Sequence, residues 1–181
     1  MLLHRTRARQ VVPVYRKFLE RFPSIEAIAS TPPSEVRNLL YSLGLHWRSD
    51  FLYRTVMEIV RSYGGHIPEK REELEALPGV SHYIASAVRC FAFGYPDVLL
   101  DTNTVRITGR LFGIPITDSS RRSKRFRELL QFLIDSDRPK QFNFALIDLG
   151  ALICRPEHPL CHQCPVRIMC HHGRQDGRNN A

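Results

Sequence analysis

Four cysteines near the end of this 181-residue chain have a spacing that could bind a metal. They are Cys154, Cys161, Cys164 and Cys170, in the pattern C-x6-C-x2-C-x5-C. A tight set of four thiolates is typical of zinc and of iron–sulfur ligand sets. A disulfide framework is the weaker interpretation, because stable disulfides belong to oxidising compartments and the first residues show no secretion signal. The spacing therefore predicts a metal or iron–sulfur site in a reducing compartment.

The fifth cysteine and the basic residues are weaker indications of function than the four-cysteine motif. Cys90 lies in an apolar stretch, 88–93, which predicts a buried structural thiol. Lys and Arg number 26 against 18 Asp and Glu, a formal net charge of +8, and basic clusters occupy 4–9 and 121–127. This excess of positive charge favours nucleic acid as a partner. The alternative is that the chain is basic without binding nucleic acid. No apolar run approaches the length that spans a membrane.

Helical periodicity dominates the chain, and no pair of strands is indicated. A helix over 52–63 carries one apolar stripe and ends at Gly64-Gly65. Further helices are expected between Thr31 and Gly44, around 129–134, and over 143–153. The predicted fold class is all-α.

A second strong signal is a helical hairpin. A short polar helix over 71–77 precedes Pro78-Gly79-Val80-Ser81, and a small-residue apolar helix follows over 82–93. Pro78 ends the first helix, and Gly79 permits a turn that a Cβ would block. The N–H groups that start the second helix then face outward, where they suit a DNA phosphate. A helical corner without a binding role is the alternative.

The hairpin is one of three motifs that occur in a particular order. The others are Leu100-Asp101-Thr102-Asn103 with Val105-Arg106, and the four-cysteine tail. In this order the chain resembles the helix-hairpin-helix DNA glycosylases of the endonuclease III superfamily. Similar segments at 2–6, 63–65 and 142–148 extend the resemblance over nearly the whole chain. It is nearest to archaeal-type thymine-mismatch glycosylases and to the catalytic domain of adenine glycosylases.

The resemblance implies two helical parts with a cleft between them. A six-helix domain with the hairpin is expected over 1–95, a smaller iron–sulfur domain over 96–173, and a tail over 174–181. By resemblance the four cysteines hold a [4Fe–4S] cluster. Zinc stays the alternative, although zinc sites more often pair two C-x-x-C knuckles and this chain has one.

The resemblance also implies catalytic roles for two residues. The family's acid after the hairpin is Asp101 here, and a carboxylate can stabilise the positive charge that builds on the sugar when an N-glycosidic bond breaks. Asp101 is also a good cap for a helix starting at Thr102, which is compatible with catalysis. Bifunctional relatives have a lysine where this chain has Tyr83, and a phenol cannot form their Schiff base. Tyr83 is expected to line the base pocket, or else to pack in the core.

Contacts with DNA are expected from the hairpin and from the N-terminal motif. The hairpin residues are Pro78, Gly79, Val80 and Ser81. Arg5, with Thr6 beside it, matches the family segment that approaches the gap left by a flipped base, although an arginine on a helix is usually solvated.

These features together predict a monofunctional base excision repair glycosylase. Asn103 matches the mismatch glycosylases, and the chain lacks the second domain of adenine glycosylases. The expected substrate is thymine or uracil opposite guanine in double-stranded DNA, and the expected protein is a monomer in a prokaryotic cytoplasm. Adenine glycosylase activity, a non-catalytic module that binds distorted duplex and an unrelated zinc protein are the alternatives. Related enzymes have a glutamate two residues before the position of Met1, so a truncated or weakly active chain is also expected.

Overall fold

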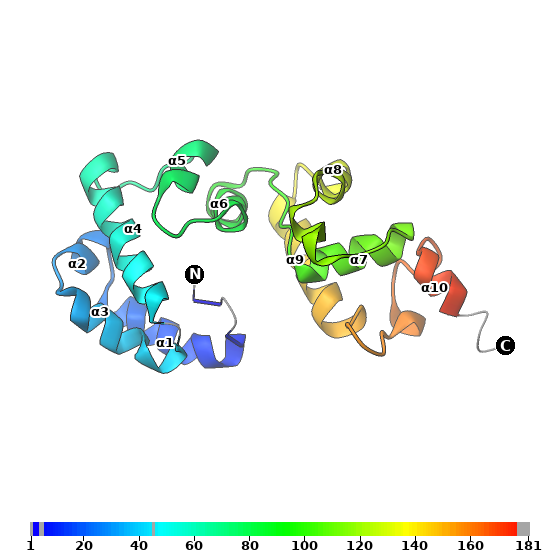
Figure 1. Cartoon of the computed structure of the whole chain (residues 1–181), viewed down its shortest axis with the longest axis horizontal. Helices are drawn as coiled ribbons and strands as arrows, with labels where there is room; N and C mark the ends of the chain where they lie inside the picture. The colour runs from blue at the N-terminus through cyan, green and yellow to red at the C-terminus, as the bar shows by residue number, and fades with distance from the viewer. Residues whose placement is uncertain (1, 4–5, 45, 177–181) are drawn as a thin grey trace. The chain divides into compact units, whose positions relative to one another are not determined.

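The computed structural model describes residues 2–3, 6–44 and 46–176, which form helices and connecting loops and contain no strand (Figure 1). This confirms the all-α fold class. Short 3₁₀ segments follow α3, precede α8 and lie in the cysteine region, and π-helical segments continue α6 and α9. The α-helices are α1 (Ala8–Arg21), α2 (Ile25–Ala29), α3 (Pro33–Leu40), α4 (Trp47–Tyr63), α5 (Arg71–Ala76), α6 (His82–Val88), α7 (Thr102–Phe112), α8 (Lys124–Leu133), α9 (Pro139–Asp148) and α10 (His171–Asp176).

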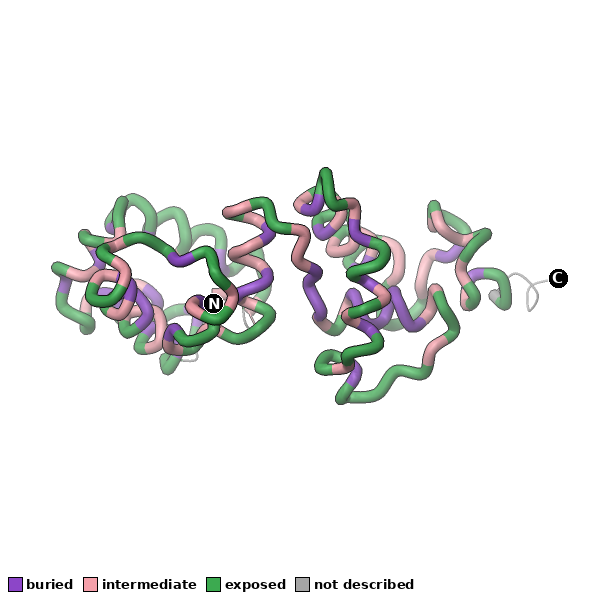
Figure 2. Tube along the Cα trace, turned by 90° about the horizontal axis from the view of Figure 1, so that it is seen from above, coloured by how far each residue is buried: buried purple, intermediate pink, exposed green. Residues whose placement is uncertain are grey.

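The chain divides into two compact units, Met1–Ala85 and Ser86–Ala181. The first holds α1 to α5 and the start of α6, and the second holds the remaining helices. The expected domain boundary after residue 95 stays a prediction. Buried residues occur in the helices of both units (Figure 2), at separate positions in α1 and over the continuous run 104–109 in α7. None of the described helices is both long enough and apolar enough to cross a bilayer.

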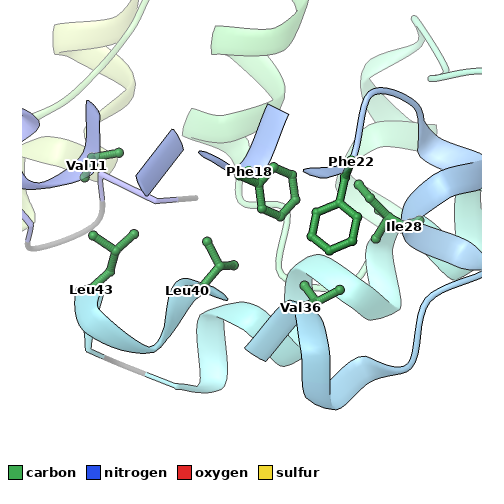
Figure 3. Close-up of a cluster of buried hydrophobic side chains, with 8 residues drawn as sticks. Val11, Phe18, Phe22, Ile28, Val36, Leu40 and Leu43 are labelled. Atoms are coloured by element: carbon green, nitrogen blue, oxygen red, sulfur yellow. The ribbon is translucent and has the colours of Figure 1, made fainter. Parts of the chain in front are cut away.

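The core of the first unit is built by α1, α2, α3 and α4, and Figure 3 shows its buried side chains. Val11 and Phe18 lie seven residues apart on one face of α1, and Phe22 follows as the residue that caps the end of this helix. They pack with the aliphatic side chains of Ile28, Val36, Leu40, Leu43 and Val56. Each fully buried side chain of this size stabilises the fold by roughly 1.5–3 kcal/mol.

The expected ends of two helices in the first unit agree with the structure, whereas α4 begins at Trp47 and not at 52. Pro33 is the first residue of α3, and a 3₁₀ turn, Tyr41–Leu43, continues that helix to Gly44. Helix α4 ends at Gly64, which has a φ of +57°, a left-handed conformation that glycine adopts without strain.

The core of the second unit lies between α7, α8, α9 and the segment before α7. Its buried side chains are Val98, Leu100, Val105, Phe126, Leu130 and Ile134. The helix expected over 143–153 is wrong at its start and in its type. Helix α9 begins at Pro139, because proline suits the first turn, and a π-helical segment replaces the α-helix over Leu149–Ile153. The wider π-helical turn directs the Gly150 carbonyl to Arg106, at 2.8 Å.

Candidate active site

The hairpin predicted from the sequence is present in the first unit and rests on α4. Helix α5 ends at Ala76 and α6 begins at His82, with Gly79 between them at a φ of +73°. A Cβ on Gly79 would lie 2.8 Å from the side chain of Phe51, so the turn approaches α4 too closely for any other residue. Thr55 fixes the turn by donating its hydroxyl to the Pro78 carbonyl at 2.5 Å.

The turn of the hairpin presents polar backbone groups. Gly79 and Ser81 are exposed, and Pro78 and Val80 are half-buried. The Val80 N–H donates to the Leu77 carbonyl, whereas the N–H groups of Gly79 and Ser81 donate to no residue in the described part of the chain. Such N–H groups are suited to an anion.

The N-terminal motif is described only in part. Arg5 lies outside the described residues. The Thr6 hydroxyl accepts a hydrogen bond from the Arg48 guanidinium at 3.0 Å, which also donates to the carbonyls of Leu2, Leu43 and Gly44. Burial lowers the pKa of Arg48 from its ordinary value. The hydroxyl of Thr6 therefore joins a buried network within the first unit.

Tyr83 lies on the first turn of α6 and is 38% exposed, so it is not a packed core tyrosine. It belongs to the first unit, and Asp101 belongs to the second. The predicted role of Tyr83 beside a base stays a prediction.

Asp101 caps α7 through one carboxylate oxygen. Its Oδ1 atom accepts from the N–H groups of Asn103 and Thr104, each at 2.8 Å. In return the Thr104 hydroxyl accepts from the Asp101 N–H at 2.9 Å, which completes a capping box. The predicted cap is therefore confirmed.

The second oxygen of Asp101 has far fewer contacts. Within the described part of the chain, its one hydrogen-bond partner is the Asn103 side-chain amide, at 3.5 Å. The residue is half-buried. The carboxylate of Asp101 is therefore held rigidly. Its Oδ1 caps α7, whereas its Oδ2 can face a substrate.

Arg106 connects the neighbourhood of Asp101 with the cysteine region. Its guanidinium donates to Asn103 Oδ1 at 3.0 Å, to the Gly150 carbonyl at 2.8 Å and to the Cys154 carbonyl at 2.8 Å. The bond to Asn103 Oδ1 turns the amide N–H₂ of that residue toward Asp101. Sequence reasoning noted Arg106 in the motif without giving it a role. The spacing of three residues on a helix could have predicted this contact, because it places Arg106 and Asn103 on the same face.

The four cysteines of the tail line a single pocket in the second unit. None of the four forms a disulfide, and the cavity that they line has a volume of about 30 Å³. Apolar side chains that include Ile107, Leu111, Leu149 and Ile153 complete its wall. The four cysteines predicted from their spacing therefore line one pocket, and their role as ligands stays a prediction.

The sulfur atoms of Cys154 and Cys170 have hydrogen-bond partners. Cys154 Sγ accepts from Arg110 at 3.5 Å, and Cys170 Sγ accepts from the Gly173 N–H at 3.4 Å. In iron–sulfur proteins such bonds to thiolate sulfur help to set the properties of the cluster.

The choice between an iron–sulfur cluster and a single zinc ion stays a prediction. Four sulfurs at 2.3 Å from one zinc would lie about 3.8 Å apart, by tetrahedral geometry. Among residues 2–3, 6–44 and 46–176, no three His, Cys, Asp or Glu side chains form such a close group.

The comparisons with known proteins agree on one family. Residues 1–132 match the model of the HhH-GPD superfamily of base excision DNA repair proteins. The chain is 42% identical to the thymine-DNA glycosylase of Aeropyrum pernix over 93% of this chain and 78% of that protein. It is 38% identical to the thymine/uracil-DNA glycosylase of Pyrobaculum aerophilum over 92% and 74%. The human adenine DNA glycosylase is 36% identical over 94% of this chain but only 32% of its own length.

Solved structures agree with these relatives. A thermostable thymine-DNA glycosylase superposes with a TM-score of 0.88 at 33% identity, over 96% of this chain and 81% of that one. Endonuclease III in a non-covalent DNA complex gives a TM-score of 0.83 at 25% identity, over 98% and 82%.

Proposed function

Because this chain belongs to the HhH-GPD superfamily of base excision DNA repair proteins, we propose that it is a DNA glycosylase acting on thymine or uracil opposite guanine. The reaction is hydrolysis of the N-glycosidic bond, which releases the base and leaves an abasic site. Support for the pyrimidine comes from the thymine and thymine/uracil glycosylases that the chain covers over most of their length.

The catalytic part of the proposal rests on one observation, which is that the two carboxylate oxygens of Asp101 have different contacts. Its Oδ1 is held by two backbone N–H groups, and its Oδ2 has one long contact within the described residues. Departure of the base builds positive charge on the deoxyribose, and a preorganised anion stabilises that charge without having to reorient. The same oxygen can instead orient the attacking water. The amide of Asn103, held by Arg106, keeps the carboxylate in place.

Substrate DNA is proposed to be held partly by the hairpin. The N–H groups of Gly79 and Ser81 are suited to bind a phosphate. The close packing of Gly79 on Phe51 and the hydrogen bond from Thr55 to Pro78 keep the turn rigid. The net charge of +8 adds a sequence-independent attraction that salt weakens. A base inside a duplex must be flipped out before it reacts, and a mismatched base costs less to unpair.

The proposed enzyme is monofunctional. Residues 71–93, which form the hairpin and its helices, contain no lysine, and Tyr83 stands where bifunctional relatives have one. Without an amine there is no Schiff base with the sugar, so the strand is not cleaved by elimination.

Cys154, Cys161, Cys164 and Cys170 are proposed to hold a [4Fe–4S] cluster. They are the four thiols of one apolar pocket, and two of them have hydrogen bonds to sulfur. When bound, such a cluster links four points of the chain and is capable of electron transfer. Anaerobically purified protein is expected to be brown, with broad visible absorbance and close to four iron atoms per chain. A colourless protein with one zinc per chain would contradict this assignment.

The function is tested with a panel of duplexes that contain G:T, G:U, or adenine opposite oxidised guanine. After incubation, alkali cleaves the strand only where a base has been lost. Cleavage of the G:T and G:U duplexes, with little of the adenine duplex and none without alkali, is the expected result. Preferential cleavage of the adenine duplex would favour the adenine glycosylases, to which the chain is also similar. Tight binding without any alkali-labile product would indicate a non-catalytic DNA-binding protein.

A further inference from the structure

Asn143, on α9, is buried in the second unit at 1% exposure, and every part of its side-chain amide is engaged. Its Oδ1 accepts from the Leu99 N–H at 3.2 Å. Its Nδ2 lies 3.0 Å from the carbonyls of Asp97 and Pro139, and 3.3 Å from Cys90 Sγ. A buried amide surrounded in this way has a single orientation, because its oxygen must face the N–H and its nitrogen must face the carbonyls.

Two of these hydrogen bonds, from the Leu99 N–H and to the Asp97 carbonyl, resemble the pairing between neighbouring strands. The Asp97 carbonyl and the Leu99 N–H flank Val98, and in an extended chain these two groups point to the same side. A neighbouring strand would normally pair with both. No strand in the described part of the chain pairs with residues 94–100, and the primary amide of Asn143 supplies both the donor and the acceptor. Asn143 therefore takes the place of a partner strand for this segment.

The segment that Asn143 holds leads directly to Asp101. The side chains of Val98, Leu99 and Leu100 are buried, so the segment cannot slide along its axis without exposing them. Asp101 follows at once, with its N–H and its carboxylate fixed by the capping box of α7. The position of the carboxylate thus depends on α7 on one side and on Asn143 on the other.

We propose that Asn143 is a positioning residue for Asp101, acting through the backbone of Asp97–Leu99. The inference rests on the proposed function, in which Asp101 stabilises the sugar charge. Asn143 touches neither the carboxylate nor any place for a substrate that the described residues define. Its effect is to hold the backbone of Asp97–Leu99 in place, so that Asp101 Oδ2 stays where the reaction needs it. A displacement of about 1 Å at a reacting group can cost about 100-fold in rate.

Two variants test this role. Asn143→Leu removes both the donor and the acceptor and keeps the branched shape of the side chain, although leucine is larger. Asn143→Asp keeps an acceptor for Leu99 but offers no N–H to the Asp97 carbonyl when ionised, and it serves if the leucine variant does not fold. Leu130→Ala is the matched control, because Leu130 is equally buried in the same core but makes no contact with Asp97–Leu99 through a polar group.

Three quantities are measured for each protein, well below its melting temperature. These are the single-turnover rate of base release from a G:T duplex, the Kd for a duplex with a non-hydrolysable 2′-fluoro-thymidine, and hydrogen exchange at the Leu99 amide. The Asn143 variants are expected to release the base about 100-fold more slowly. Their Kd should stay within about twofold of the original protein, and the Leu99 amide should exchange faster. Leu130→Ala should lower the melting temperature and leave the rate within about threefold.

Two outcomes overturn the proposal. One is a rate in the Asn143 variants that falls no more than in Leu130→Ala, which would make Asn143 an ordinary core residue. The other is unchanged exchange at Leu99, which would show that the amide does not hold the segment. If the original protein releases no base from any duplex, the proposed function fails, and the exchange at Leu99 alone decides whether Asn143 holds the segment.

Discussion

The guanidinium of Arg106 donates to the main-chain oxygen of Cys154 at 2.8 Å, across 48 residues of sequence. The same guanidinium fixes the amide of Asn103, which lies beside the Asp101 carboxylate. One buried side chain therefore connects the first cysteine of the pocket with the proposed catalytic acid.

Replacing Arg106 by glutamine should disturb both ends of this connection. The carbonyls of Gly150 and Cys154 lose a charged donor, at a cost of roughly 1–3 kcal/mol, and Asn103 becomes free to turn. Visible absorbance and the single-turnover rate of base release should both fall. Arg110→Gln is the control, because Arg110 also lies on α7 and contacts Cys154 but has no bond to Asn103. An equal loss of rate in both variants would show that the bond to Asn103 is unimportant.

The hairpin turn should not tolerate a side chain at Gly79. Gly79→Ala adds a Cβ 2.8 Å from Phe51, besides the strain of a positive φ, about 1–2 kcal/mol. The turn must move, and the Kd for duplex DNA should rise at least about tenfold. Gly64→Ala is the control, because Gly64 also has a positive φ but open space around it. Similar DNA affinities in the two variants would separate the turn from DNA binding, as measured by fluorescence anisotropy.

Tyr83 allows a gain-of-function test of the monofunctional assignment. Tyr83→Lys introduces an amine at the position of the family's Schiff-base lysine, so borohydride should trap a covalent complex with mismatch DNA. The original protein should give no trapped complex. Tyr83→Phe should also give none, because neither side chain forms an imine. Trapping by the original protein would contradict the assignment, since another amine would then attack the sugar.

The thiol of Cys90 should make stability depend on pH in the alkaline range. Burial raises the pKa of Cys90, so the folded protein holds this proton at a pH where the unfolded chain has lost it. The free energy of unfolding should therefore fall as pH rises above about 8.5, by at most about 1.4 kcal/mol per pH unit from this group. Denaturant titrations should show a shallower decline for Cys90→Ala. Parallel declines would mean that the Cys90 thiol does not contribute.

Regular elements could be predicted from the sequence where a local signal exists. The stripe over 52–63 and the glycine after it predicted α4 and its end, because periodicity and a left-handed cap are properties of neighbouring residues. The cysteines were predicted to meet from their spacing, and they line one pocket. The cap at Asp101 was likewise predicted from an acid just before a helix.

Contacts between distant residues could not be predicted in this way. Arg106 and Cys154 lie 48 residues apart, and Asn143 and Leu99 lie 44 apart. Their bonds depend on how α7 and α9 pack, which no local pattern encodes. The π-helical turn at Leu149–Ile153 was missed for the same reason, since its Gly150 carbonyl bonds to Arg106 on another helix.

The most direct test of the central claim is the single-turnover rate of base release by Asp101→Asn on a G:T duplex. Asparagine caps helices as well as aspartate does, so α7 should keep its start and the protein its melting temperature. The variant should bind the duplex with nearly unchanged Kd and release thymine at least about 100-fold more slowly. Release at the original rate would contradict the account, because the charge on the sugar would then be stabilised by another group.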